Sequence, residues 1–156
     1  MGTFGPAQVV RFRHDLIMTE IAYEDIKVDD EASLTRTITE AHIVNYASLT
    51  GDWNPAHADA EYAAQSMFGE RIAHGMLIAG LISTVLGTQL PGPNSIYLGQ
   101  DLKFIAPVKI GDTVKIVVTV LEKRDEKRII KLRTTASNQR GEPVIDGSAV
   151  VKKIGL

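Results

Sequence analysis

A carboxylate and an imidazole stand five residues apart in the segment Gly51-Asp52-Trp53-Asn54-Pro55-Ala56-His57. The Asn54-Pro55 pair predicts a bend, which can bring the side chains of Asp52 and His57 to one water. A positioned carboxylate and imidazole can act as acid and base in proton transfer. Taken alone the spacing is weak evidence, because Asp52 is also a typical turn or capping residue.

His74-Gly75-Met76 follows after sixteen residues and opens an apolar stretch. The first N–H groups of a helix have no partner within it, and the helix dipole favours negative charge at that end. Because glycine allows a carbonyl group to approach the backbone closely, the Gly75 N–H is a candidate donor to a developing oxyanion. These groups together are what proton transfer beside a thioester carbonyl requires.

Helices are expected on both sides of the loop. Their ranges are 40–50, 59–65 and about 75–89. Thr39 and Asp59 are the expected N-terminal caps of the first two helices, and Gly51 is the expected end of the first. The third helix carries apolar side chains on nearly every side, so we expect it to be buried.

Strands are expected mainly in the second half of the chain. Their ranges are 33–39, 95–104, 112–123, 128–137 and 143–152. Short connections between the last three favour an antiparallel meander. A buried helix with a curved antiparallel sheet around it is an α+β architecture.

The segment from Tyr46 to Val151 resembles the MaoC-like, or (R)-specific enoyl-CoA hydratase, family of hot-dog folds. The matching stretches are Leu49-Thr50-Gly51-Asp52-Trp53-Asn54-Pro55-Ala56-His57, Ile72-Ala73-His74-Gly75-Met76-Leu77, 86–93, 96–100, 107–108 and 110–112. They keep the family's order and spacing over about two-thirds of the chain. The chain is also similar to the hydratase domain that some bacterial proteins join to a phosphate acetyltransferase domain.

The resemblance implies a long central helix wrapped by a curved antiparallel sheet. It also implies reversible hydration of a trans-2-enoyl-CoA to an (R)-3-hydroxyacyl-CoA. Asp52 and His57 would be the catalytic dyad, the Gly75 amide would bind the thioester carbonyl, and Ser83 would line the pocket. A hydrogen bond from Ser83 to its own helix backbone is the alternative for that residue. Which member of the dyad takes the first proton stays open.

The remaining polar candidates are given supporting roles. Asn54 is a candidate contact of the substrate, although a hydrogen bond that shapes the loop is the favoured interpretation. His74 could line the site, but a structural role is the favoured interpretation. We expect no cofactor and no metal, because the four histidines lack a ligand spacing. Walker-type and Rossmann glycine patterns are also missing.

Other functions remain possible on the same residues. The first alternative is a dehydratase acting on acyl carrier protein, or a hydratase for a branched or dicarboxylic thioester. An alternative of another class is a catalytically silent module that binds acyl-CoA, which the presence of both Asp52 and His57 disfavours. Thioesterases share the hot-dog fold but commonly rely on a carboxylate on the central helix. The helix 75–89 contains no acidic residue, which disfavours that activity.

Composition limits the partners. The 156 residues suit one domain, expected over 21–156 after a flexible N-terminal extension of 1–20. A net charge of -2 argues against nucleic acid as a partner. The apolar run 75–82 is too short to cross a membrane, which needs roughly 20 residues. The chain has no cysteine, which excludes disulfides and is compatible with the cytoplasm, where we expect the protein.

A homodimer is expected. The edge strands of a single sheet would be open, and Val117, Leu121 and Ile129 add apolar side chains on the outward face. The resemblance implies that two sheets pair edge to edge, with the acyl pocket near the subunit boundary.

Overall fold

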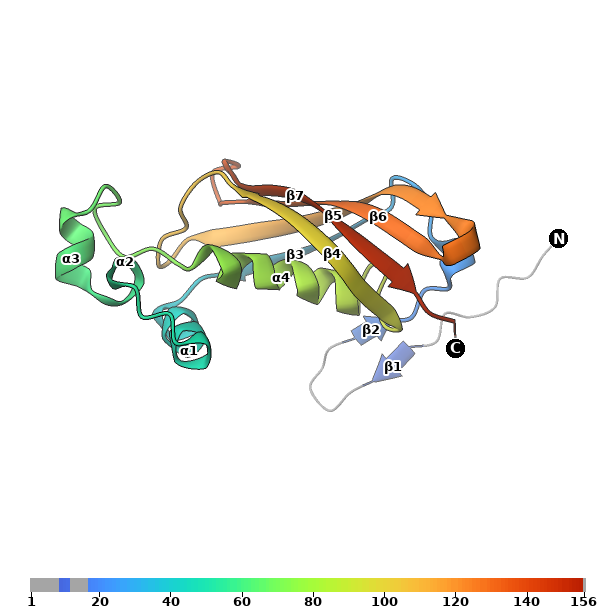
Figure 1. Ribbon diagram of the computed structural model, residues 1–156, viewed down its shortest axis with the longest axis horizontal. Coiled ribbons are helices and arrows are strands. Elements are labelled where there is room, and N and C mark those ends of the chain that lie inside the picture. The colour runs from blue at the N-terminus through green and yellow to red at the C-terminus, as the bar shows by residue number, and fades with distance from the viewer. Residues whose placement is uncertain (1–8, 12–16, 156) are drawn as a thin grey trace.

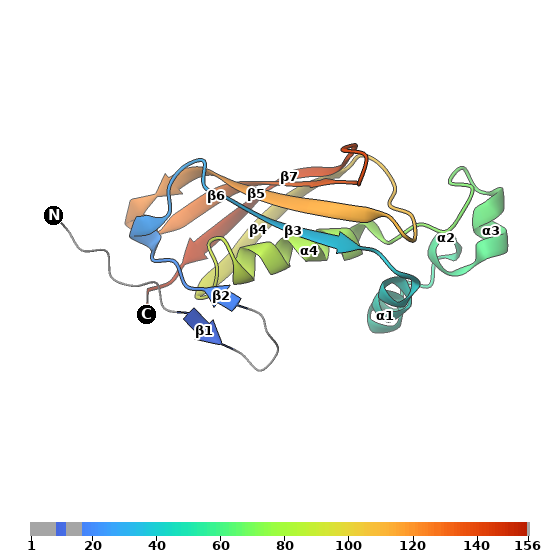
Figure 2. The same ribbon diagram turned by 180° about the vertical axis from the view of Figure 1, so that it is seen from behind.

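A five-stranded antiparallel sheet curves over one long helix, as Figures 1 and 2 show from opposite sides. This computed structural model describes residues 9–11 and 17–155. The strands are β3 (Glu31–Thr37), β4 (Ser95–Phe104), β5 (Thr113–Arg124), β6 (Ile129–Ser137) and β7 (Pro143–Lys153). The helix is α4 (Gly75–Thr88). The expected α+β hot-dog fold is therefore confirmed.

The order of the strands is β3-β5-β6-β7-β4, so β3 and β4 are the edges. The expected meander is correct for β5, β6 and β7. It does not extend to β4, which precedes them in sequence but pairs with β7 on the far side. The backbones of β4 and β7 approach each other closely at Gly147. Any larger residue would clash there, because a β-carbon at this position would lie 2.0 Å from the backbone oxygen of Asp101.

The three short helices project beyond one end of the sheet (Figure 1). They are α1 (Glu40–Thr50), α2 (Pro55–Ala58) and α3 (Ala60–Gln65). As expected, the Thr39 hydroxyl accepts from the His42 N–H at the start of α1, and Asp59 accepts from two N–H groups of α3. Gly51 ends α1 in the left-handed region, with φ 79°.

The first strand of the large sheet begins earlier than the range 33–39 predicted. It ends at Thr37, whose hydroxyl lies 2.8 Å from that of Thr113 on β5. Ile38 then enters the core and Thr39 caps α1. The alternation of apolar and polar residues therefore continues for two residues past the end of β3. Ile38 is apolar because it packs in the core, and Thr39 is polar because it caps α1.

The core lies between the sheet and one face of α4. Its largest contributions from the helix are Ile78, Ile82, Val85 and Leu86, which are buried against inward side chains of β5 and β6 such as Ile116 and Leu132. The expectation that α4 is buried all round is wrong for the single chain. Met76, Gly80, Ser83 and Gly87 are exposed, because one sheet can cover only one side of a helix.

The N-terminal part of the described chain contacts the sheet through hydrogen bonds and an ion pair. A 3-10 turn, η1 (Tyr23–Asp25), packs against the turn η2 (Asp125–Lys127) between β5 and β6. The buried ammonium of Lys153 lies 2.9 Å from the Glu20 carboxylate and 3.1 Å from the backbone oxygen of Pro91. The contact between Lys153 and Glu20 links residues near the two ends of the described chain. No helix in residues 9–11 and 17–155 is long and apolar enough to cross a membrane.

The expected extension 1–20 falls mostly outside the described residues. Of this stretch, β1 (Val9–Arg11) and β2 (Ile17–Thr19) are described and pair with each other.

Candidate active site

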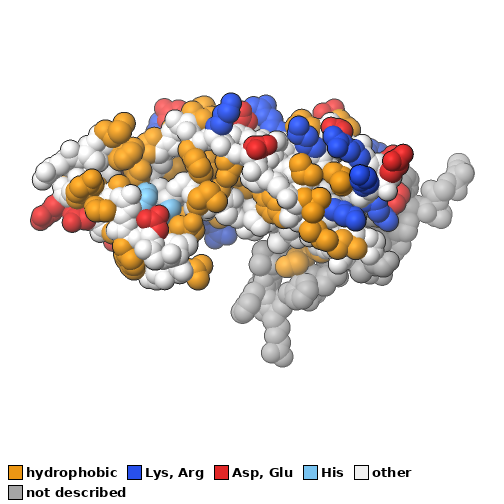
Figure 3. Space-filling view, viewed as in Figure 1, with side chains coloured by type: hydrophobic (Ala, Val, Ile, Leu, Met, Phe, Trp, Pro, Cys, Tyr) orange, Lys and Arg blue, Asp and Glu red, His pale blue; other side chains and the backbone are white. Residues whose placement is uncertain are grey.

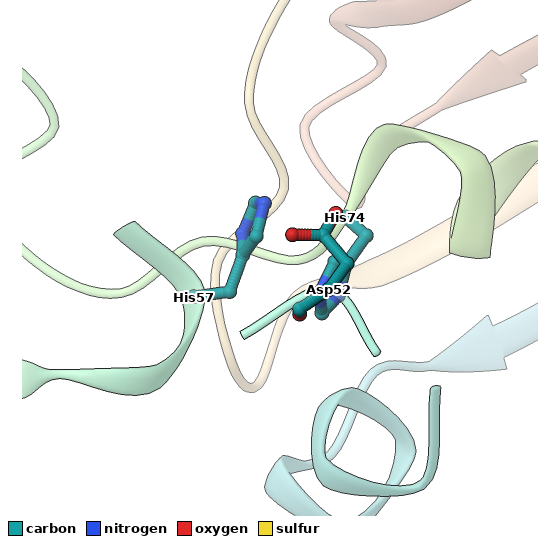
Figure 4. A group of neighbouring side chains, drawn as sticks. All are labelled: Asp52, His57 and His74. Carbon is teal, nitrogen blue, oxygen red and sulfur yellow. The ribbon is translucent and has the colours of Figure 1, made fainter. Parts of the chain in front are cut away.

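The two predicted proton-handling groups come together at the end of the sheet from which α1, α2 and α3 project. Asp52 lies in the loop between α1 and α2, and its carboxylate faces the ring of His57, which α2 presents (Figure 4). One ligand-capable atom from each of Asp52, His57 and His74 lies within 4.8 Å of the others. A separation of this size suits one water between the carboxylate and the imidazole.

Local contacts fix the His57 ring in one tautomer. Its Nδ1 lies 2.8 Å from the backbone oxygen of Ile72, and since a carbonyl only accepts, Nδ1 carries the proton. The neutral ring then has its lone pair on Nε2, where a base needs it. The helix start that carries the ring is set by Asn54, which accepts from the Ala56 N–H at 3.0 Å, and by Pro55 in the first helical position.

His74 lies against both groups. Its side chain is buried, and Nε2 donates to the backbone oxygen of Asp52 at 2.9 Å. The His74 ring also lies against two others in tilted arrangements, with its centroid 3.9 Å from that of His57 and 4.7 Å from that of Tyr46. The interpretation of His74 as structural is therefore incomplete, because this residue contacts the dyad directly.

A cavity of about 500 Å³ opens beside His57. Apolar side chains form most of its wall, among them Met67, Phe68, Met76, Phe104 and Ile105. Gly75, the first residue of α4, also lines the cavity, and its N–H has no hydrogen-bond partner in the described part of the chain. One cavity is thus lined by the His57 imidazole, by Gly75 with its free N–H at a helix start, and by apolar side chains.

Comparisons with known proteins identify the family of this chain. The model of the MaoC like domain matches residues 23–141. The chain belongs to the MaoC-like family. A protein of Rhodospirillum rubrum named (R)-specific enoyl-CoA hydratase is 53% identical over 129 residues, which cover 83% of this chain and 89% of the relative.

Two further MaoC-like relatives are similarly close. A 3-hydroxybutyryl-CoA dehydratase of Methylorubrum extorquens is 47% identical over 130 residues, which cover 83% of this chain and 82% of the relative. The solved structure of an R-hydratase from Pseudomonas aeruginosa has a TM-score of 0.82 at 45% identity and covers 88% of this chain and 89% of that one.

Of the predicted site residues of this MaoC-like chain, His57 and Gly75 line the large cavity, whereas Asp52, Asn54 and Ser83 are not among its lining residues. The Asn54 side chain caps α2, which is the favoured of its two predicted roles. Ser83 lies eight residues beyond Gly75, roughly 12 Å along α4. It lines a separate small cavity of about 110 Å³ with Ser95 and Tyr97. Ser83 is exposed, and among the described side chains of α4 the hydroxyl that bonds to the helix backbone is that of Thr88.

Sequence reasoning missed part of the wall. Phe104 is the last residue of β4 and was interpreted only as part of a strand, and Ile105, which follows it, was given no role. A β-carbon at Gly75 would lie 2.8 Å from the Phe104 ring, so the glycine lets this ring pack against the start of α4. The sequence signal was an uninterrupted apolar run, residues 104–108, where a strand should end in polar residues.

A metal ion could be held only at the same place, as far as the described residues go. Asp52, His57 and His74 form the group with suitable ligand atoms. The sequence argument against a metal considered ligand spacing along the chain, and His74 comes from a different segment than Asp52 and His57. Because the same atoms serve proton transfer and hold the loop, the geometry has a use without an ion.

Proposed function

We propose that the protein is a hydro-lyase that adds water reversibly to a trans-2-enoyl-CoA and forms the (R)-3-hydroxyacyl-CoA. One observation carries the proposal: the lone pair of His57 Nε2 and the free N–H of Gly75 lie at one apolar cavity, with the Asp52 carboxylate beside the imidazole. The names of the relatives from R. rubrum and M. extorquens describe this reaction in its two directions.

The contacts suggest how the groups divide the work. A water held between Asp52 and His57 attacks C3 of the enoyl thioester, and His57 Nε2 takes its proton. The same proton then passes to C2, so no other proton source is needed. Negative charge that develops on the thioester oxygen meets the Gly75 N–H at the start of α4. The acyl chain lies along Phe104, Ile105 and the methionines of the wall.

The dimer is part of the proposal. Ile96, Tyr97 and Leu98 are three consecutive exposed side chains on β4, an edge strand. Figure 3 shows apolar side chains gathered over α4 and β4 on one face. A β-carbon at Gly80 or Gly87 would meet no atom within 4 Å, which leaves room for a second backbone. These features favour two chains joined through β4.

Such a dimer gives Ser83 a place in the site. A twofold axis makes paired edge strands antiparallel, so the two α4 helices also run in opposite directions. The start of one helix, with Gly75, then lies beside the second half of the other, with Ser83. The large cavity of one chain continues into the small cavity at Ser83, Ser95 and Tyr97 of the partner. The enzyme would work in this form in the cytoplasm.

Hydration of crotonyl-CoA tests the proposal. The enoyl thioester loses its ultraviolet absorbance as the double bond is hydrated, and we expect saturable loss with the purified wild-type chain. The same acyl group on acyl carrier protein is the parallel substrate, and faster turnover there would favour the carrier-protein dehydratase. A folded protein that changes neither substrate would overturn the proposal and favour a silent binding module.

A further inference from the structure

His74 contacts both members of the dyad but does not line the cavity. We propose that His74 is a positioning residue for the hydration reaction. It holds the loop of Asp52 and the ring of His57 in place relative to the N–H of Gly75, the next residue in the chain. This inference rests on the proposed function, and its test separates the two.

The loop of Asp52 depends on this contact. Within the described residues, the other hydrogen bonds of Asp52 and Trp53 reach no further than two residues along the chain, at 3.1 to 3.3 Å. The bond from His74 Nε2 to the Asp52 oxygen spans 22 residues and is shorter, at 2.9 Å. Because the loop is exposed, little else fixes the carboxylate against the body of the domain.

The chemistry of His74 argues against simple filling of space. Its Nδ1 is buried and has no hydrogen-bond partner among the described residues. A buried nitrogen without a partner costs free energy that an apolar side chain of similar size avoids. The imidazole is therefore explained by what its other nitrogen does, which is to donate to Asp52.

The position of His74 at the start of α4 supports the same conclusion. Residues that precede a helix usually cap it with a side-chain oxygen, but the His74 side chain makes no such bond. It turns instead toward the dyad, and the N–H of Gly75 stays free for the substrate. One short segment, from Ile72 to Gly75, thus sets three groups: Ile72 orients His57, His74 holds Asp52, and Gly75 supplies the donor.

Two amides at position 74 test the inference. The amide nitrogen of His74→Gln can take the place of Nε2 and donate to the Asp52 oxygen, whereas the shorter His74→Asn cannot reach it. We expect His74→Asn to lower kcat by about 10²-fold, the scale of a small misplacement of reacting groups. His74→Gln should recover most of that loss. KM for crotonyl-CoA should stay within about threefold in both variants, because His74 is not part of the cavity wall.

Two comparisons make the result specific. His42→Gln changes a histidine of the α1 cap, away from the cavity, and should leave kcat as in the wild type. In an Asp52→Asn background, His74→Asn should lower the remaining rate by less than about threefold, because residues that act through each other are not additive.

The opposite results would overturn the inference. Folded His74→Asn with the kcat of the wild type would do so, as would equal losses in the Gln and Asn variants. Full additivity with Asp52→Asn would remove the link to the carboxylate. If the His74→Gln or His74→Asn variant does not fold, the soluble folded fraction of His74→Leu is measured in its place. A wild-type kcat per folded molecule of His74→Leu would again reject the inference. A wild type that hydrates no enoyl thioester would instead remove the proposed function.

Discussion

One backbone oxygen decides what His57 can do. Because the Ile72 carbonyl occupies Nδ1, the lone pair is left on Nε2 beside Asp52. The sequence predicted Asp52, His57 and Gly75 because their motif is local and its residue types are those of proton transfer. It could not predict the role of His74, whose contact to Asp52 spans 22 residues and whose burial is set by packing.

Asp52→Asn and His57→Ala should each keep the fold and lower the hydration rate by about 10²-fold or more, because positioned acid–base groups contribute on this scale. Both residues lie outside the hydrophobic core, so circular dichroism and melting temperature should stay close to those of the wild type. Steady-state rates with crotonyl-CoA measure the effect. Near-native turnover in either folded variant would remove that residue from the dyad.

Gly75→Ala tests the amide donor. The added β-carbon would lie 2.8 Å from Phe104 Cε1, so the ring must turn away or the start of α4 must move. We expect kcat/KM to fall by about 10-fold to 10²-fold, less than loss of a whole oxyanion donor. Phe104→Leu in the same chain removes the clash and should recover part of the activity. Unchanged kcat/KM in Gly75→Ala would contradict the close packing around this amide.

At the scale of elements, local signals and long-range pairing differ in how far sequence reasoning reaches. The caps Thr39 and Asp59 and the stop at Gly51 were predicted correctly, because a cap is made by neighbouring residues. The pairing of β4 with β7 was not, because it joins strands that others separate in sequence. The exposed face of α4 was also missed, since its apolar composition does not say that one sheet covers only one side of the helix.

The contact between η1 and η2 should make the free energy of unfolding depend on pH. The Tyr23 hydroxyl donates to Asp125 at 2.8 Å, and burial, with that hydrogen bond, raises the pKa of Tyr23 to about 12. An unfolded tyrosine titrates near 10, so the unfolded chain loses its proton first as pH rises. The stabilisation is therefore complete below about pH 10 and is lost between about pH 10 and about pH 12.

Tyr23→Phe should lower the free energy of unfolding by about 1 kcal/mol at neutral pH, because one hydrogen bond is lost. It should also lose less stability than the wild type between about pH 10 and about pH 12. Urea unfolding across this range measures both effects. Tyr62→Phe, at an exposed position on α3, is the control and should follow the wild type. An unchanged alkaline slope in Tyr23→Phe would show that this hydroxyl is not the group responsible.

At the scale of the whole molecule, the proposed dimer covers the free face of α4 and the edge of β4. Light scattering at low micromolar concentration should report about twice the chain mass of 17.0 kDa. Leu98→Lys places a charge on the β4 edge and should give monomers with reduced activity. Leu49→Lys makes the same change at an exposed leucine of α1 and should stay dimeric. A fully active wild-type monomer would exclude the shared cavity.

The stereochemistry of the product tests the central claim most directly. Crotonyl-CoA is hydrated by the wild-type protein, and the 3-hydroxybutyryl-CoA is then offered to an (R)-specific and to an (S)-specific dehydrogenase. We expect NADH to form with the (R)-specific enzyme alone, and its rate of formation to fall by about 10²-fold or more when Asp52→Asn replaces the wild type. A robust signal from the (S)-specific enzyme, or equal signals with and without the Asp52 carboxylate, would contradict the account.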